Sequence, residues 1–465
     1  MSSPVLVPQR RRSLAGPIVL IALGILFLLG NLHIITWGRI GVWFAHYWPL
    51  LLILWGGVKL YEHYRAKNEG VPASGIGAGG VFLLIFVVLL GLTATGILKA
   101  KDQINWGAVR DDIQMDEDLV LLFGNDYVYE QQVEQDFPVG ASLRIVSDRG
   151  SVNVNVWDEK NIRVVARKSI FAKDQGTADS RNAQSAPQFQ VNGNSVVLNA
   201  NTKGAGDATV RADLDVFMPK GASLDIATRR GDVVINPGFV GDVKISNSRG
   251  DVMADTVKGN VVLTVERGSA RLNKIDGNVT FQGRGDNVDI AEVSGTVRVS
   301  GDVMEGMKLT NIKKSVIFQS SRTDMELASV EGDLSLDSGD LRGTRITGPV
   351  KLITRSKDIH LEDVSGDVRL ENNNGMVELH TADRVPMGNI EVSNDRGDIR
   401  LVVPGKANFQ VNATTRRGEV QSDFNELTIN NSDHGQSVVT GNVGKPTSKI
   451  QVTSDSGDIE IRKIS

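Results

Sequence analysis

Cysteine is absent from this chain, and its absence limits both the chemistry and the means of stabilisation. No cysteine occurs among the 465 residues, which excludes disulfide bonds, thiolate metal ligands and cysteine nucleophiles. A domain outside the cytoplasm would therefore depend on packing and backbone pairing. Histidine is also scarce, with six residues, and His33, His46 and His63 belong to the apolar N-terminal part.

Basic residues are in short supply beyond that part. Residues 102–465 hold 42 Lys or Arg against 53 Asp or Glu, whereas residues 1–101 hold nine basic residues against two Glu. The large C-terminal part is therefore acidic, and an acidic surface repels phosphate backbones. The sequence predicts no nucleic-acid partner.

The N-terminal part contains three long apolar runs, at 13–38, 41–60 and 79–98. The first carries no Asp, Glu, Lys or Arg, and each is long enough to cross the roughly 30 Å hydrocarbon layer as a helix. His46 and Pro49 fall in the first half of the second run. The pattern predicts three transmembrane helices and the lipid bilayer as a partner.

The distribution of basic residues predicts how these helices are oriented. Three arginines at 10–12 precede the first run, and Lys59, Arg65 and Lys67 lie between the second and the third. Short cytoplasmic segments keep Lys and Arg. We expect a multi-pass protein of the cell (inner) membrane with a cytoplasmic N-terminus and an extracytoplasmic C-terminal domain. A cleavable signal peptide is the alternative, but the first run lacks a small-x-small cleavage site.

A glycine followed by a short polar and then an apolar residue recurs through the C-terminal part at intervals of nine or ten residues. Two kinds of corner alternate: in one the glycine follows a polar or charged residue, as in SRGD or DSGD, and in the other it ends an apolar-x-Gly unit, as in FVG or VKG. The full repeat is therefore about 18 residues long. Between corners, apolar and polar residues alternate, which is typical of a strand with one buried face.

This interval is too short for a crossover helix, and a hairpin meander gives no reason for two alternating corners. The pattern predicts an all-β domain after the membrane helices: a parallel β-solenoid, or β-helix, with two strands and about 18 residues per coil. Structural glycines are expected at the repeat corners Gly231, Gly241, Gly250, Gly259, Gly268, Gly277, Gly295, Gly332, Gly339, Gly348, Gly366, Gly375, Gly388 and Gly397.

The triplet Arg-Gly-Asp recurs at 230–232, 249–251, 284–286 and 396–398. It could be a cell-adhesion signal or a corner of the repeat. Because it follows the period, and because near-copies replace Asp with Ser or Glu, we interpret it as a structural corner. Glycine allows a positive φ or a close approach of coils, and Asp can bond nearby backbone.

The pattern divides the chain into five parts. A membrane domain is expected over 1–103, a linker over 104–140, a β capping region over 141–230, the solenoid over 231–403 and an irregular C-terminal β cap over 404–465. Within the first cap, KDQGTADSRNAQSAPQFQVNGNS is interpreted as a polar loop. Terminal units of this kind protect open sheet edges.

Several phrases resemble a known family. VGASLRI, PKGASLDIATRRGDVVI and the recurrent S-x-x-G-D units resemble the adhesin-like β-strand-repeat proteins of bacteria, a domain family of unknown function. LAGPIVLIALGILFLLGNL and YWPLLLILWGGVKL are similar to the LiaI/LiaF-like transmembrane region. The resemblance implies a bacterial envelope protein with a β-solenoid outside the membrane and a link to envelope-stress sensing. It offers no catalytic residues.

Parallel β-helices include glycan-cleaving enzymes, whose sites need carboxylates and basic groups clustered on one face. His360 and His380 lie at different offsets from their corners, so no shared metal site is expected. We predict no catalytic, cofactor-binding or metal-binding residue and no cofactor. The residues expected to face outward alternate in sign: Lys244, Asp289, Arg298, Lys351, His360, Arg369, Glu378 and Arg400.

These observations favour a non-enzymatic, membrane-anchored, adhesin-like scaffold outside the cytoplasm. Its surface would face an envelope protein, a polysaccharide or further copies of the chain. An envelope-stress sensor that signals through its helices is the alternative, and a glycan-acting β-helix enzyme is a weaker one. A groove that gathers three or more Asp, Glu or Arg would favour the enzyme.

Overall fold

The structure is a computed structural model, in which the chain forms two compact units. One comprises 1–127 with 171–179, and the other comprises 128–170 with 180–465. The described residues of the predicted apolar runs are helical, and the remainder of those runs lies outside the described residues. No helix among the described residues has both the length and the hydropathy of a bilayer crossing. The structure describes residues 47–50, 53, 56–57, 88–89, 125–205, 209–431 and 435–464.

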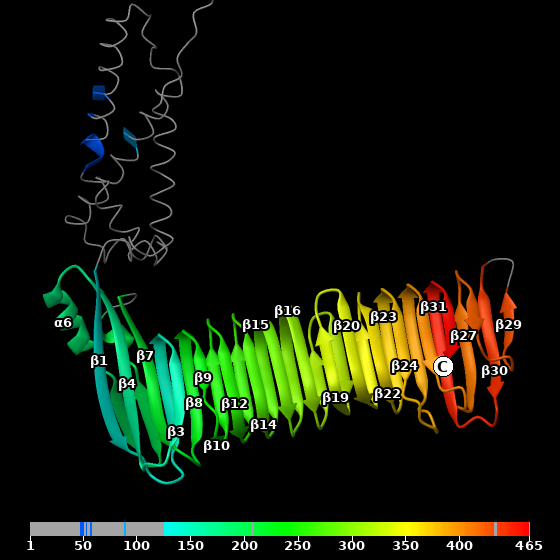
Figure 1. Ribbon diagram of the computed structural model, residues 1–465, viewed down its shortest axis with the longest axis horizontal. Coiled ribbons are helices and arrows are strands. Elements are labelled where there is room, and N and C mark those ends of the chain that lie inside the picture. The colour runs from blue at the N-terminus through cyan, green and yellow to red at the C-terminus, as the bar shows by residue number, and fades with distance from the viewer. Residues whose placement is uncertain are drawn as a thin grey trace, which may run out of the picture. The chain divides into compact units, whose positions relative to one another are not determined.

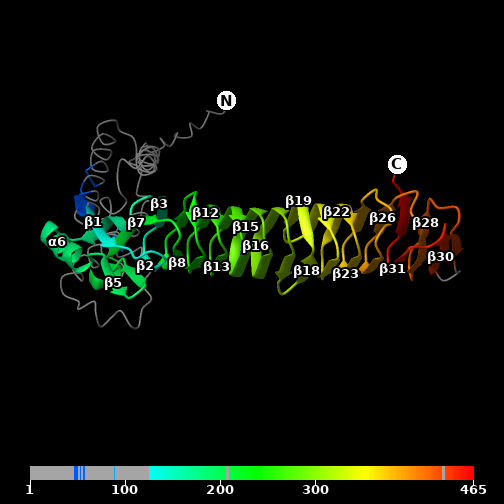
Figure 2. The same ribbon diagram turned by 90° about the horizontal axis from the view of Figure 1, so that it is seen from below.

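The second unit is mostly β, as the sequence predicts. Its strands stack side by side in two ladders, seen as a long row in Figure 1 and as two layers in Figure 2. Ladder A contains, in stacking order, β5 (Gln188–Asn192), β6 (Ser195–Asn199), β2 (Ser142–Arg149), β8 (Ser223–Arg230), β11 (Val243–Asn247), β13 (Val261–Val265), the first part of β15 (Val279–Val293), the first part of β16 (Val297–Ile312), β17 (Val316–Gln319), β18 (Thr323–Leu327), β21 (Val350–Thr354), β23 (Val368–Asn374), β25 (Ile390–Arg396), β31 (Ser448–Ser456), β27 (Phe409–Thr415), β30 (Ser437–Val443) and β29 (Thr428–Asn431).

The other layer is built in the same way and shares β15 and β16 with the first. Ladder B contains, in stacking order, β1 (Asn125–Asp136), β4 (Asn161–Ala172), β7 (Val210–Pro219), β3 (Val152–Trp157), β9 (Val233–Ile235), β12 (Val252–Lys258), β14 (Ala270–Asp276), the second parts of β15 and β16, β19 (Ser329–Leu336), β20 (Asp340–Thr347), β22 (Asp358–Ser365), β24 (Val377–Thr381), β26 (Ile399–Val403), β32 (Ile459–Lys463) and β28 (Val420–Ser422).

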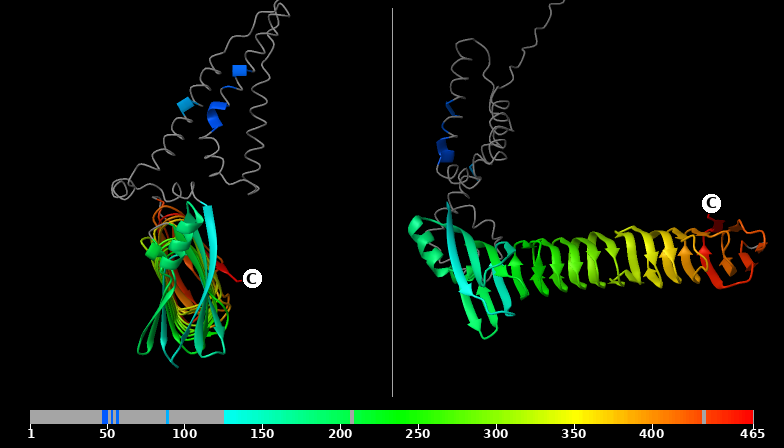
Figure 3. Two further views of the ribbon diagram at one scale, coloured as in Figure 1. Left: turned by 90° about the vertical axis from the view of Figure 1, so that its left-hand side faces the viewer. Right: turned by 60° about the horizontal axis from the view of Figure 1, so that its bottom comes forward.

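One strand from each ladder makes a lap of the chain, and equivalent residues of successive laps lie side by side. Val243 of β11 is in parallel register with Val261 of β13, which is in register with Val279 of β15. Each step is the 18-residue interval of the glycine corners. The apolar side chains between the ladders, such as Leu263 and Phe281, are fully buried, and each contributes roughly 1.5–3 kcal/mol. Viewed along the stack, the laps superimpose (Figure 3).

Several laps also have a bend that two plain strands do not account for. Thr256, Lys274 and Glu292 have positive φ values of 53°, 55° and 55°, a conformation that costs non-glycine residues free energy. The alternation slips by one residue there, so that Ala254 and Val257 are both buried. The bend adds a short third side, where β10 (Phe239–Val240) pairs with 257–258.

The corners explain three of the four Arg-Gly-Asp triplets, whereas residues 284–286 lie inside β15. Asp232 Oδ1 accepts a hydrogen bond from the backbone N–H of Asp251 at 2.9 Å, and Asp251 Oδ1 accepts one from Ser269 at 2.8 Å. Each Asp therefore satisfies a donor of the next lap. A Cβ atom on Gly268 would lie well inside the van der Waals contact distance of the Gly250 carbonyl oxygen, so the corner excludes larger residues.

One lap in the middle of the stack runs backwards, which the sequence pattern did not predict. β17 and β18 pair antiparallel, and β19 pairs antiparallel with both β16 and β20. Gly332, expected at a corner, instead lies inside β19, where the register with β20 shifts. The other predicted corner glycines lie between strands. An alternation of period two has no direction, so the sequence pattern is equally compatible with a reversed strand.

The expected linker and polar loop both contain secondary structure. β1 begins at Asn125 and thus lies within the predicted linker. The segment interpreted as a polar loop forms α6 (Gln175–Gln184) and β5. Asp174 caps α6, because its Oδ1 accepts a hydrogen bond from the backbone N–H of Thr177 at 2.8 Å.

The C-terminal laps are stacked out of sequence order. β31 and β32 lie between the lap of β25 and β26 and the lap of β27 and β28, in parallel register with both. The last strands of the chain therefore fill a slot that the preceding laps leave open. Their side chains Ile459 and Ile461 are fully buried. This region is a set of regular strands, where the sequence pattern predicted an irregular cap.

Candidate interaction face

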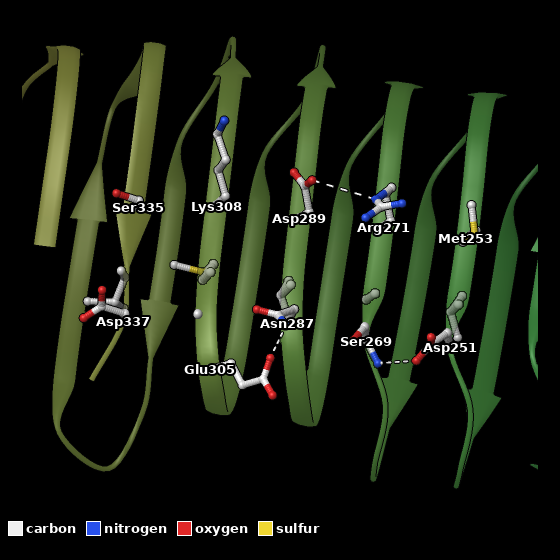
Figure 4. A pocket seen from close by; sticks show the side chains of 16 residues that line it. Asp251, Met253, Ser269, Arg271, Asn287, Asp289, Glu305, Lys308, Ser335 and Asp337 are labelled. Carbon is white, nitrogen blue, oxygen red and sulfur yellow. Dashed lines mark hydrogen bonds and ion pairs between the residues drawn. The ribbon is translucent and has the colours of Figure 1, made fainter. Parts of the chain in front are cut away.

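A groove of 590 Å³ crosses the outer side of ladder B over β12, β14, β15, β16 and β19. Two rows of side chains line it, each with one member in or beside each strand (Figure 4). We call them the central row and the corner row. The central row is Met253, Arg271, Asp289, Lys308 and Ser335; the corner row is Asp251, Ser269, Asn287, Glu305 and Asp337.

The strand register produces the central row. Met253 pairs with Arg271, Arg271 with Asp289, and Asp289 with Lys308, because these residues occupy the same outward position in successive laps. Opposite charges are therefore direct neighbours. Arg271 Nε lies 3.9 Å from Asp289 Oδ2, and these side chains are 69% and 45% exposed. Such an exposed pair contributes little to stability, so both charges remain accessible to a ligand.

The corner row carries carboxylates that are engaged in hydrogen bonds. Asp251 accepts a hydrogen bond from the backbone N–H of Ser269, and Glu305 accepts one from the side-chain amide of Asn287. Asp337 Oδ1 accepts hydrogen bonds from the backbone N–H groups of Asp340, at 2.7 Å, and Gly339, at 2.8 Å. These bonds hold the pKa of Asp337 below its ordinary value.

The groove thus brings together four carboxylates, which is the arrangement that would favour an enzyme. The residues are Asp251, Asp289, Glu305 and Asp337. A glycosidase needs a general acid whose pKa is raised, whereas the pKa of Asp337 is shifted in the opposite direction. Asp337 is therefore not suited to the role of the general acid.

Farther along ladder B, the same outward position carries a second polar cluster. His360 of β22 and Glu378 of β24 are in register. His360 Nδ1 lies 2.9 Å from Glu378 Oε2, and its Nε2 lies 2.7 Å from Glu362 Oε1. His380 Nε2 lies 3.0 Å from Glu378 Oε1, and the two imidazole centroids are 5.8 Å apart. We call His360, Glu362, Glu378 and His380 the histidine cluster.

Burial and hydrogen bonding oppose each other in this cluster. Burial by itself lowers the pKa of His360, but the bonds to Glu362 and Glu378 outweigh it and raise the pKa above its ordinary value. Burial by itself raises the pKa of Glu378, but the bonds from His380 and His360 lower it overall. The cluster therefore favours a charged His360 beside a charged Glu378.

An ion-pair chain joins this cluster to the C-terminal strands. Arg400 of β26 has its Nη1 3.6 Å from Glu378 Oε1 and its Nε 2.9 Å from Oε2 of Glu460, which lies on β32. Arg462 continues the chain: its Nε lies 3.3 Å from Glu460 Oε2, and its Nη1 lies 3.0 Å from Asp423 Oδ1. The outward side chains thus connect four successive strands with the loop after β28.

The predicted outward residues divide between the two ladders. Lys244, Arg298, Lys351 and Arg369 lie on ladder A, and Asp289, His360, Glu378 and Arg400 lie on ladder B. His360 and His380 occupy different positions relative to their corners, yet their side chains lie close together, because Glu378 contacts both. Across the described ranges, no group of three or more His, Cys, Asp or Glu is arranged to hold a metal ion. Arg271 and Lys308 were not predicted from the sequence, although the 18-residue interval from Arg271 to Asp289 was a signal for the row.

Two family matches cover most of the chain. The Toastrack DUF4097 family matches residues 141–344 and again 335–462, and the LiaF transmembrane domain matches residues 15–109. A membrane region followed by a repeated β domain defines the class of protein. The chain belongs to the Toastrack DUF4097 family, and its LiaF transmembrane domain marks it as a membrane protein. The resemblance to adhesin-like repeat proteins and to a LiaF-like region is thereby confirmed.

Three solved structures were also found to be similar, each over 72% of this chain. They are a candidate cell adhesion protein from Clostridium sporogenes, with 9% identity, 100% of that chain covered and a TM-score of 0.17; a candidate adhesin from Bacteroides fragilis, with 12%, 97% and 0.18; and a candidate adhesin from Parabacteroides distasonis, with 8%, 98% and 0.21. At these values they carry no functional conclusion for this chain. No curated protein matches it.

Proposed function

We propose that this protein is a non-enzymatic scaffold of the bacterial envelope, anchored by three N-terminal transmembrane helices. The N-terminus faces the cytoplasm, and the β-solenoid lies outside the membrane. Its outer surface binds an envelope protein or polysaccharide. The match of residues 15–109 to a transmembrane domain supports the anchor, and the basic residues at 10–12 support the orientation.

One observation carries the binding role. The outward side chains of ladder B form a groove of 590 Å³ in which accessible charges of both signs repeat from lap to lap. A repeated, solvent-exposed row on a stacked β framework suits an extended partner, because stacked repeats create extended binding surfaces.

Co-sedimentation tests this role. Full-length protein in detergent micelles is mixed with insoluble envelope material, together with a variant carrying Arg271→Ala, Asp289→Ala, Glu305→Ala and Lys308→Ala. This variant keeps the net charge, since two charges of each sign are removed. We expect the native protein to pellet with the envelope material and the variant to stay largely in solution. Equal pelleting of the two proteins would remove the groove from the proposal.

A sensor is the second candidate, because the chain carries a LiaF transmembrane domain. In this case the β domain binds a ligand and the helices pass the signal to a membrane partner. An envelope-stress reporter, measured with the native chain and with the four-residue groove variant, distinguishes the two roles. A scaffold leaves the reporter unchanged when the groove is altered, whereas a sensor changes its output.

A glycan-acting enzyme is the weakest candidate, and the four carboxylates of the groove are what supports it. Incubation of full-length protein with isolated envelope polysaccharide tests it. The scaffold proposal expects no new reducing ends. Release of reducing ends by the native chain, lost in Asp289→Asn, would replace the scaffold with an enzyme.

A further inference from the structure

We infer that the groove binds a polysaccharide without net charge, laid along the stacking direction of the strands. The inference rests on the scaffold function proposed above and names the ligand class of its interaction face. It follows from the spacing of the rows, from their chemistry and from the way the strands are paired.

The spacing comes first. Strands of a sheet lie about 4.8 Å apart, so the five strands under the groove place their outward side chains along about 19 Å at that interval. A β-1,4-linked sugar extends a chain by a distance close to one lap. An extended peptide instead advances about 3.3 Å per residue, and its side chains would fall out of phase with the laps.

The side chains supply hydrogen bonds at each lap. Ser335 provides a hydroxyl, Lys308 an ammonium group and Asp289 a carboxylate, all on the central row (Figure 4). Sugar hydroxyls both donate and accept, so they can pair with each of these groups. Charge alternates over the three middle members of the row, Arg271, Asp289 and Lys308, so a polyanion would meet repulsion at Asp289 and a polycation at Arg271 and Lys308.

The pairing of the strands disfavours a peptide. β12, β14, β15, β16 and β19 each have a paired neighbour on both sides, so none offers a free edge for an added strand. Protein interfaces depend on buried aromatic or arginine anchors. None of the described residues that line the groove is aromatic, and its arginine, Arg271, has a side chain that is 69% exposed rather than buried. Met253 is its one large apolar side chain more than a third exposed, at 43%.

Titration calorimetry on full-length protein in detergent micelles tests the inference. The probes are β-1,4-linked chitooligosaccharides and cello-oligosaccharides from disaccharide to octasaccharide, with polylysine and dextran sulfate as charged probes. We expect affinity for the neutral probes to rise with each sugar until the oligosaccharide spans β12 to β19, and then to level off. The charged probes are expected to bind no better at the groove than a monosaccharide.

A charge-matched pair of variants locates the site. Asp289→Ala with Lys308→Ala removes one charge of each sign from the groove, and Arg298→Ala with Asp324→Ala does the same on the outer side of ladder A. The groove pair is expected to weaken binding of the longest probe by about tenfold, or about 1.4 kcal/mol. The ladder A pair is expected to leave it unchanged. Matching circular dichroism melts of both variants show that they fold.

The outcomes separate this inference from the proposed function. If no neutral oligosaccharide binds while the native chain still pellets with envelope material through the groove, the ligand is a protein or a charged polysaccharide. The inference of a neutral polysaccharide is then wrong, but the scaffold stands. Binding that is equal in both variant pairs, or independent of oligosaccharide length, also overturns the inference. If groove-dependent pelleting is absent as well, the proposed function fails with it.

Discussion

His360 Nδ1 lies 2.9 Å from Glu378 Oε2, one lap away, while His360 Nε2 lies 2.7 Å from Glu362 Oε1. Both ring nitrogens thus face carboxylate oxygens, which only accept hydrogen bonds when ionised. A neutral imidazole has a single N–H donor, so the imidazolium alone satisfies both contacts. The geometry and the raised pKa of His360 therefore point the same way, and they make stability depend on pH.

The first prediction is a stability maximum in mildly acidic solution. The pKa of His360 is raised on folding, so its contribution is complete below the unfolded value, about 6.5, and is lost as pH rises through the folded value. The pKa of Glu378 is lowered, so its contribution is lost as pH falls. Thermal unfolding of full-length protein between about pH 3 and about pH 8 should show the midpoint falling on both sides, on the acid side only below the unfolded pKa of Glu378, about 4.3.

Two variants check the source of this effect. His360→Gln keeps a hydrogen-bonding side chain that does not titrate, and it should flatten the fall on the alkaline side. Arg369→Gln also removes a cation that contacts carboxylates, Glu371 and Glu391, but Arg369 keeps its charge throughout this range. It should leave the slope unchanged. The other ionisable groups around His360 are His380, Arg342 on β20 and Arg400 on β26. If the unfolding midpoint of His360→Gln falls with rising pH as steeply as that of the native protein, the histidine cluster is not the source of the pH dependence.

The second prediction separates close approach from backbone conformation at the corners. Gly277 does not have a positive φ, but a Cβ there would overlap the Gly259 carbonyl oxygen. Gly221 has a φ of 81° with nothing within 4 Å of its Cβ position. We expect Gly277→Ala to cost about 3 kcal/mol or more and Gly221→Ala only about 1 kcal/mol in denaturant unfolding. The reverse order would show that contact between laps is not what selects glycine.

The third prediction concerns the strained bend. Lys274 has a φ of 55°, a region that asparagine tolerates better than lysine. Lys274→Asn should therefore stabilise the protein by up to about 1 kcal/mol. Lys244→Asn, in the middle of β11, replaces an equally charged residue in extended backbone and should destabilise slightly. A stability loss of the same size at both sites would show that the bend stores no strain.

The fourth prediction tests the order of the C-terminal laps. Ser393 of β25 is in register with Thr453 of β31, and Thr453 is in register with Thr414 of β27. Because the chain has no cysteine, Ser393→Cys with Thr453→Cys should form a disulfide on mild oxidation. Ser393→Cys with Thr414→Cys should not, since two laps place them about 9.6 Å apart, beyond the reach of a disulfide. Crosslinking of the second pair alone would mean that the laps follow sequence order.

Much of the β domain could be predicted because the glycine period is a local signal with a physical cause. In three of the four triplets the Asp, namely Asp232, Asp251 or Asp398, bonds the next corner, and the glycine admits the neighbouring backbone, so both residues recur along the stack. The bend at Thr256 left a signal too, since the apolar alternation changes phase between Ala254 and Val257. That slip was not recognised as a third side of the lap.

The remaining features depend on which laps become neighbours, and the pattern does not encode this. The reversed strands β18 and β19 alternate just as forward strands do, so direction is invisible in the sequence. The last lap carries the same alternation as the lap of β25 and β26, so its insertion 60 residues out of order could not be foreseen. The histidine cluster was within reach, because His360 and Glu378 are separated by 18 residues, one full repeat.

The central claim is that the face of ladder B is presented outside the membrane, and site-specific labelling tests it most directly. A single cysteine is introduced at Ser335 in the groove or at Asn68 between the second and third apolar runs, in a chain with no other cysteine. A membrane-impermeant maleimide is then applied to intact cells. We predict that Ser335→Cys is labelled at once and Asn68→Cys only after permeabilisation. Labelling of Asn68→Cys in intact cells, with Ser335→Cys protected until permeabilisation, would contradict the account.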